Sequence, residues 1–232
     1  MAVCLSAVCA QAIGAALKER VVYQSGKDPL HAAFLDIKNN FFYFGAGDQL
    51  FKCRPDRDGV HVLPLRGESI QDIFIDSFSP NTVYVAAEKG VYVSHDFGAS
   101  FDRIFSASLR EDETFLRCRS VVAFGGRVLV GTEEGLYVSD TGSWIWNPIR
   151  DIPRSAAVMS IVYDSGSRAV WVATDHGVYR SPDGSMSFKR VMAALSPDDE
   201  QAASDEEMER AMSVPLCLFI DTPAARVFVG TT

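Results

Sequence analysis

Five segments of this chain read alike, and this internal repeat limits the possible fold more than any other feature of the sequence. Each segment begins with a β-branched and aromatic run, such as VYVAA or VLVGT, and a short turn then leads into a second run such as GVYVS. Equivalent positions are separated by 41, 45, 42 and 57 residues, and a period of about 40–50 residues is typical of repeat architectures. The positions that give these spacings are Tyr43, Tyr84, Leu129, Trp171 and Phe228.

Each repeat divides into four predicted strands with no helical spacing of apolar residues between them. The first strand of four of the five repeats ends in an aspartate and a turn sequence, and the second and third strands flank a turn such as EKG, EEG or DHG. We therefore predict an all-β fold, a β-propeller of four-stranded antiparallel blades with four full blades and a partial fifth, in an open arc. The first strands are expected at 34–37, 73–75, 121–124, 161–163 and 218–220, and the fourth at 60–65, 101–105, 145–149 and 188–192.

The two ends of the chain suggest a fragment of a longer protein. The last repeat stops at Thr232 after its second strand, and Arg20–Gln24 reads as a fourth strand whose three predecessors are missing. Residues 1–19 have no charge before Lys18 and predict either a signal-peptide remnant or a short N-terminal helix. The repeats at 20–232 are expected as blades at 32–66, 69–106, 117–150 and 157–194 and a partial blade at 214–232, with an acidic insert at 195–213.

The turn between the third and fourth strands carries a family resemblance. SHDFGASF at 94–101 matches the pattern Ser-x-Asp-x-Gly-x-x-aromatic, SPDGSMSF at 181–188 has its glycine one place early, and SDTGSW at 139–144 is shorter. The chain thus resembles the Asp-box repeat propellers (BNR, sialidase-like, with photosystem assembly factors and sortilin-type receptors among them). The predicted box residues are Ser94, Asp96, Gly98, Phe101, Ser139, Asp140, Gly142, Trp144, Ser181, Asp183 and Phe188.

We predict that these box residues are structural. A short carboxylate accepts backbone N–H groups across a tight turn, glycine supplies a positive φ, and the aromatic residue fixes the turn to its blade. The aspartates that end the first strands also recur in phase, whereas a catalytic acid is needed only once. These residues, Asp36, Asp76, Asp164 and Asp221, are therefore predicted to be turn residues.

Composition excludes several classes of function. The net charge is -8, which argues against nucleic acid as a partner, and no apolar run is long enough for a membrane-spanning helix. Seven of the 30 acidic residues lie between residues 198 and 210, so the rest of the chain is nearly neutral. No Cys or His cluster has zinc-ligand spacing, so we expect no metal or cofactor. Cys53, Cys118 and Cys217 are expected as small buried side chains, with their disulfide state open.

Few residues suggest a ligand site. Arg117 and Arg119 precede a predicted inner strand and either face a central channel or lie at a solvated strand edge. Trp144 and Trp146 either stack on sugars or pack between blades. A glycoside hydrolase needs paired acids in a cleft, or a tyrosine nucleophile with an arginine cluster for acidic sugars, and neither is recognisable.

The sequence therefore predicts a non-enzymatic binding or assembly module with a protein or carbohydrate ligand. Its predicted location is periplasmic or extracellular, or cytoplasmic if residues 1–17 are not a signal. The alternatives are an extracellular sensor domain of a signalling protein and a glycoside hydrolase of the sialidase-like or xyloglucanase-like type. The fold by itself does not choose among these functions.

Overall fold

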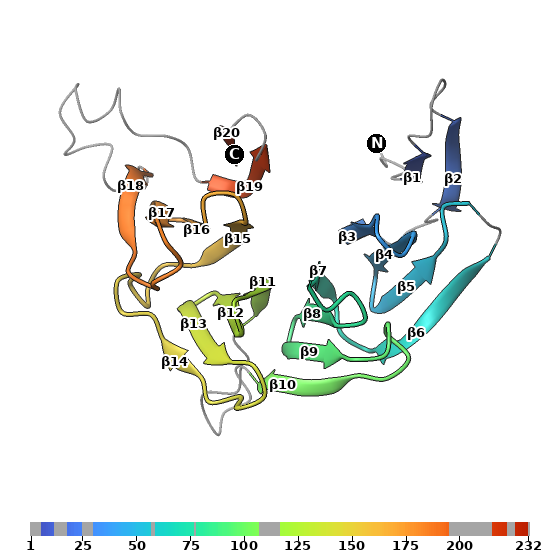
Figure 1. Ribbon diagram of the computed structural model, residues 1–232, viewed down its shortest axis with the longest axis horizontal. Helices are drawn as coiled ribbons and strands as arrows, with labels where there is room; N and C mark the ends of the chain where they lie inside the picture. Colours follow the sequence, from blue (N-terminus) through green and yellow to red (C-terminus); the bar gives the residue numbers. More distant parts are fainter. Residues whose placement is uncertain are drawn as a thin grey trace. The chain divides into compact units, whose positions relative to one another are not determined.

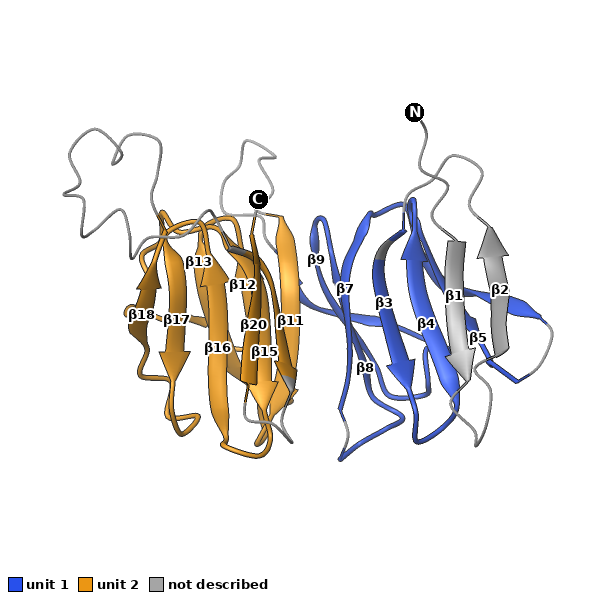
Figure 2. Ribbon diagram, turned by 90° about the horizontal axis from the view of Figure 1, so that it is seen from above, with its two compact units in different colours: residues 1–115 blue, residues 116–232 orange. Residues whose placement is uncertain are grey.

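A computed structural model describes residues 6–11, 18–24, 30–56, 59–76, 78–106, 117–194, 215–221 and 226–231. Every regular element among them is a β-strand, as predicted (Figure 1). The strands form four sheets of four strands and two sheets of two strands, and every pairing is antiparallel. The chain divides into two compact units, residues 1–115 and 116–232, which Figure 2 distinguishes by colour.

Unit 1 contains two complete four-stranded sheets, each built in chain order. The first strands of the two sheets, β3 and β7, contact each other, which is the arrangement of successive propeller blades. Pro64, which has no N–H to donate, lies exposed in β6, the outermost strand of its sheet. The strands are β3 (Leu30–Asp36), β4 (Phe41–Ala46), β5 (Gln49–Cys53), β6 (Val60–Arg66), β7 (Ile70–Ile75), β8 (Val83–Ala87), β9 (Gly90–Ser94) and β10 (Asp102–Ser106).

Unit 2 repeats this plan with two complete sheets and a two-stranded one. The first strands again contact one another in sequence, β11 with β15 and β15 with β19. The strands are β11 (Cys118–Phe124), β12 (Arg127–Thr132), β13 (Gly135–Asp140), β14 (Asn147–Pro148), β15 (Val158–Asp164), β16 (Ala169–Thr174), β17 (Gly177–Ser181), β18 (Lys189–Ala193), β19 (Pro215–Asp221) and β20 (Arg226–Thr231).

The first strand of every sheet carries an irregularity that the sequence did not predict. The register shifts near the start of each, in β11 between Cys118 and Ser120 and in β15 between Val158 and Ser160. In β11 and β15 the residue after the shift bonds to the next sheet, because Ser120 Oγ accepts from the Ile161 amide at 3.1 Å and Ser160 Oγ from the Leu218 amide at 3.4 Å. These two bulges thus help to join successive sheets.

The cores consist of apolar residues from the β-branched and aromatic strands. In unit 1 one cluster includes Tyr43, Leu50, Ile70 and Val85, all essentially inaccessible to solvent. In unit 2 the side chains of Ala173, Val178 and Leu218 form a cluster that joins the last two sheets.

The structure corrects three expectations about the termini and the cysteines. Residues Ser6–Gln11 form strand β1 and not a helix, and β1 pairs with β2 (Lys18–Gln24). The predicted strand at Arg20–Gln24 is therefore confirmed, but a strand does precede it. Cys53 and Cys118 are buried as expected, whereas Cys217 is exposed because it lies in the two-stranded sheet. The acidic insert at 195–213 lies outside the described residues.

Strand β14, the fourth strand of the third four-stranded sheet (β11–β14), is shorter than predicted. Its predicted range was 145–149, but only Asn147 and Pro148 are in strand conformation. Ile145 is 70% exposed in the preceding turn, and the Asn147 side chain donates to its carbonyl oxygen at 3.4 Å. The chain then returns toward the sheet, where the Ile149 amide donates to the Leu136 carbonyl oxygen at 2.8 Å.

Candidate functional site

The turn at 94–101, between β9 and β10, is closed by two side chains. The buried Ser94 hydroxyl donates to Asp96 Oδ1 at 2.7 Å and accepts from the Gly98 amide at 2.7 Å. Asp96 in turn accepts from the Ser100 amide at 2.9 Å and from the Ser100 hydroxyl at 2.6 Å. Phe101 packs against the core of unit 1. Serine, aspartate and aromatic residue thus occupy the places that a turn-closing role requires.

The Asp96 carboxylate is exposed but strongly favoured in its ionised form. The hydrogen bonds from the Ser100 side chain and backbone, followed by the one from Ser94, lower its pKa to about 2. Hydrogen bonds to a carboxylate stabilise the charged state. Asp96 is therefore an acceptor within its turn and does not hold a proton to donate at neutral pH.

The same turn is bonded to the preceding sheet. Phe97, at a φ of 59°, presents its carbonyl oxygen to the Lys52 ammonium at 2.9 Å and to the Tyr43 hydroxyl at 3.3 Å. The Lys52 nitrogen also lies 3.8 Å from the centre of the Phe41 ring, a cation–π contact. Burial is the main cause that lowers the pKa of Lys52 and raises that of Tyr43.

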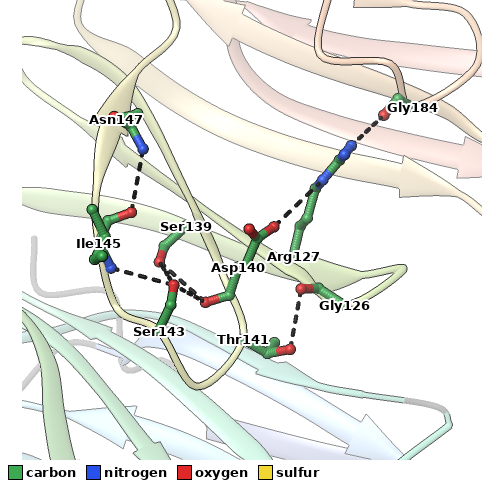
Figure 3. A network of polar contacts seen from close by, with 9 residues as sticks. All are labelled: Gly126, Arg127, Ser139, Asp140, Thr141, Ser143, Ile145, Asn147 and Gly184. Carbon is green, nitrogen blue, oxygen red and sulfur yellow. Dashed lines mark hydrogen bonds and ion pairs between the residues drawn. The ribbon is translucent and has the colours of Figure 1, made fainter.

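The turn at 139–144 has a different arrangement. Ser139 and Ser143 both donate to the Asp140 carbonyl oxygen, at 3.1 and 3.0 Å. The Asp140 carboxylate points away from the turn and lies 3.8 Å from Arg127 Nε (Figure 3). Gly142 and Trp144 have positive φ angles of 86° and 50°. Here the aspartate directly follows the serine, and its carboxylate contacts a neighbouring strand.

The turn at 181–188 is intermediate between these two. Asp183 accepts from the Ser185 amide at 3.0 Å, and hydrogen bonds from Ser185 lower the pKa of Asp183. Ser181 is buried, but its hydroxyl has no hydrogen-bond partner among the described residues. The amide of the buried Phe188 donates instead to Asp151 Oδ2 at 2.8 Å, which belongs to the chain leaving the third sheet.

The aspartates that end the first strands also hold turns, as the sequence predicted. Asp36 accepts from the Asn39 amide at 3.1 Å, and Asp76 accepts from the Phe78 amide at 2.9 Å. Asp164 accepts from the Gly166 amide at 3.0 Å and from the Ser167 hydroxyl at 2.5 Å. The side chain of Asp221 lies outside the described residues.

Arg117 and Arg119, the predicted ligand candidates, lie at the start of β11. Arg119 donates to Glu133 at 2.8 Å in an ion pair in which both side chains are about one-third exposed. The Arg119 Nε atom is buried and has no hydrogen-bond partner among the described residues. Arg117 is exposed, and its carbonyl oxygen accepts from the Glu133 amide at 3.2 Å. This pair therefore lies at the end of the sheet opposite the box turns.

Two hollows lie between the third and fourth four-stranded sheets, β11–β14 and β15–β18, and neither was predicted from the sequence. One, which we call the Arg168 hollow, measures about 250 Å³ and is lined by Phe124, Arg127, Tyr163, Arg168 and Asp183, with Gly125 and Gly184. The other, which we call the Ile145 hollow, measures about 490 Å³, and its lining includes Arg127, Val138, Ile145, Asn147 and Met186.

Arg127 separates these two hollows and belongs to both. Its guanidinium donates to the Gly184 carbonyl oxygen at 3.3 Å on one side and approaches Asp140 on the other (Figure 3). The rings of Phe124 and Tyr163 stack with their centres 4.1 Å apart and their planes 6° from parallel. Two arginines beside a rigid aromatic pair can hold an anionic group of a ligand.

Comparisons with known proteins give the fold but not the family. No family model matches the chain, and no curated protein matches its sequence. Among solved structures, the chain is similar to the extracellular domain of the two-component system BT4673 from B. thetaiotaomicron (TM-score 0.66, 14% identity, 87% of this chain and 26% of that one). It is also similar to the GH74 enzyme of Niastella koreensis (TM-score 0.63, 14% identity, 90% and 34%) and to a chain of a nidogen/laminin complex (TM-score 0.67, 9% identity, 96% and 80%).

These likenesses, together with the sheets described above, show an all-β propeller fold. The chain spans about a quarter of the length of the extracellular domain and about a third of the GH74 enzyme. None of the described residues forms a helix long and apolar enough to cross a membrane. The described residues also contain no group of three or more His, Cys, Asp or Glu side chains that could hold a metal ion.

Proposed function

We propose that this chain is a non-enzymatic binding module of the Asp-box propeller type that works outside the cytoplasm. In this proposal the box residues of the three turns are structural, and the ligand, a protein or a carbohydrate, binds between sheets of unit 2. The observation that carries the proposal is the state of the box carboxylates. Asp96 and Asp183 accept hydrogen bonds within their own turns, and both have pKa values below the usual range.

This state is the opposite of what glycoside hydrolysis requires. Such an enzyme needs one carboxylic acid that keeps its proton near neutral pH, which means a raised pKa, and a second carboxylate nearby. The carboxylate in the lining of the Arg168 hollow is that of Asp183, which is ionised and bonded to Ser185. The hollow therefore has the chemistry of a binding surface.

Two other functions have some support. An extracellular sensor domain of a signalling protein is the second candidate, because the chain resembles the extracellular domain of BT4673. A glycoside hydrolase is the third, because the chain also resembles GH74 enzymes. Location outside the cytoplasm is supported by the likeness to an extracellular domain.

The test combines turnover with binding. The purified chain is incubated with aryl-glycosides and with xyloglucan oligosaccharides, and it is applied in parallel to glycan and peptide arrays. We expect no hydrolysis above that of the Asp183→Asn variant, and saturable binding to at least one class of probe. Hydrolysis that Asp183→Asn or another single carboxylate substitution abolishes would contradict the proposal.

A further inference from the structure

The two hollows of unit 2 adjoin each other at Arg127, which lines both of them. Its guanidinium donates to the Gly184 carbonyl oxygen at 3.3 Å, and its Nε lies 3.8 Å from Asp140 Oδ1 (Figure 3). A ligand that lies across Arg127 therefore meets a charged hollow on one side and a hollow with apolar side chains on the other. We develop this surface as an extension of the proposed binding function, on which it rests.

The Arg168 hollow is suited to a carboxylate. The Arg168 guanidinium makes no hydrogen bond or ion pair with any residue that the structure describes, so its donors are available. Its backbone has a φ of 61°, an unusual value for a residue with a side chain. The Asp164 carboxylate holds the preceding residues Gly166 and Ser167, so the turn that presents Arg168 is organised before a ligand arrives.

The Ile145 hollow offers aliphatic contacts. Val138, Ile145 and Met186 are the apolar residues of its lining, beside polar residues that include Asp140 and Asn147. Ile145 is 70% exposed although it is a large apolar residue. An exposed isoleucine beside a methionine, whose side chain adapts to different shapes, is a favourable place for an apolar side chain of a partner. Asn147 adds an amide at the rim that can bond to a backbone group of the partner.

The lining favours a peptide over a sugar. Sugars bind well to the free flat faces of aromatic rings, and the two rings that line the Arg168 hollow, Phe124 and Tyr163, each cover one face of the other. The Ile145 hollow has aliphatic side chains at its wall. Arginine together with exposed apolar residues is also typical of protein interfaces.

We propose that this surface binds an extended acidic peptide segment of a partner protein. A glutamate or aspartate of the segment pairs with Arg168 beside Arg127, and a bulky apolar residue of the segment occupies the Ile145 hollow. The charges are complementary at Arg168, which has no ion-pair partner among the described residues, whereas Arg127 lies 3.8 Å from Asp140 and the Asp183 carboxylate is already bonded to Ser185.

The test uses synthetic peptides as the probe. An array presents ten-residue peptides with one central glutamate and a bulky apolar residue at varied distances, and a matched array carries glutamine instead. The best glutamate peptide is then titrated by fluorescence polarisation against the whole chain and against Arg168→Gln, Ile145→Ser and Arg190→Gln. Arg190 is exposed on β18 of the same unit and lines neither hollow, so it controls for loss of one positive charge.

We expect selective binding to glutamate peptides that weakens with added salt. Arg168→Gln and Ile145→Ser should each raise Kd about fivefold, whereas Arg190→Gln should leave it unchanged. Circular dichroism confirms that each variant is folded. Equal Kd values for the chain and Arg168→Gln, or no peptide bound above background, would overturn this inference. Glycan binding in that case would leave the proposed binding function standing, and only hydrolysis would contradict that function.

Discussion

The turn at 94–101 and the turn at 139–144 occupy the same place in successive sheets, but their aspartates act differently. In the first, one residue separates Ser94 from Asp96, and the carboxylate reaches forward to Ser100. In the second, Asp140 directly follows Ser139, and only its carbonyl oxygen serves the turn. In these two turns a difference of one residue in spacing accompanies the change from a carboxylate that closes its own turn to one that contacts Arg127 of the neighbouring strand.

The largest expected effect is at the glycines of these two turns, which should differ in how well they tolerate a side chain. Gly98 has a φ of 89°, and a Cβ there would lie 2.8 Å from Leu63 of the preceding sheet, whereas a Cβ at Gly142, with a φ of 86°, would meet nothing. We expect Gly98→Ala to lower the free energy of unfolding by about 2 kcal/mol and Gly142→Ala by about 1 kcal/mol. Urea denaturation followed by circular dichroism measures both. An equal decrease in the free energy of unfolding for both variants would show that the close approach of a Cβ at residue 98 to Leu63 does not destabilise the fold.

The cations that reach the box turns from the preceding sheet give the second contrast. Lys52 donates to the Phe97 carbonyl oxygen at 2.9 Å and lies over the Phe41 ring, whereas Arg127 donates to Gly184 at 3.3 Å on an exposed surface. Lys52→Met should therefore cost about 1 kcal/mol, and Arg127→Met less than about 0.5 kcal/mol. Thermal melting of both variants tests this order, and a larger effect at Arg127 would contradict it.

The smallest expected effect is the pH dependence of the turn at 94–101, because its carboxylate is exposed. The pKa of Asp96 is lowered in the folded state, so its contribution to stability is complete above about pH 4 and disappears as the pH falls toward 2. At pH 6 we expect Asp96→Asn to melt below the unsubstituted chain, with the difference vanishing near pH 2. Asp140→Asn is the matched control, since the Asp140 carboxylate accepts no hydrogen bond from its own turn. A difference that persists unchanged at pH 2 would argue against this role of the carboxylate.

The strands of the sheets could be predicted from the sequence because the residues that specify each strand lie in the strand itself and in the turns beside it. β-Branched and aromatic runs such as VYVAA and GVYVS, with turn residues between them, predicted the strands that β8 and β9 form. The sequence was insufficient for β1, because the residues SAVCAQ are small and uncharged and match a signal segment or a helix as well as a strand. Only pairing with β2 makes this segment a strand.

The hollows of unit 2 were not predictable from the sequence for a different reason. Arg127 begins β12 and Arg168 lies in the turn before β16, 41 residues further along the chain. Arg226 begins β20 at the repeat position of Arg127, so the repeat itself does not mark Arg127 as a ligand residue. The proximity of Arg127 and Arg168 depends on the packing of the third sheet against the fourth, which includes the stacking of Phe124 on Tyr163. Arg117 and Arg119 were predicted as ligand candidates because they stand at the start of a predicted inner strand, but Arg119 is engaged by Glu133.

The pKa of the Asp96 carboxyl group tests most directly the claim that a box carboxylate closes its turn and does not act as an acid. It can be measured by carbon-13 NMR titration of the folded chain with labelled aspartate, with Asp96→Asn to assign the signal. We predict a midpoint at about 2, well below the ordinary value of 3.8, because Ser94 and Ser100 bond to the ionised group. A midpoint at or above 3.8 would contradict the account, because it would mean that these bonds do not hold the carboxylate in solution.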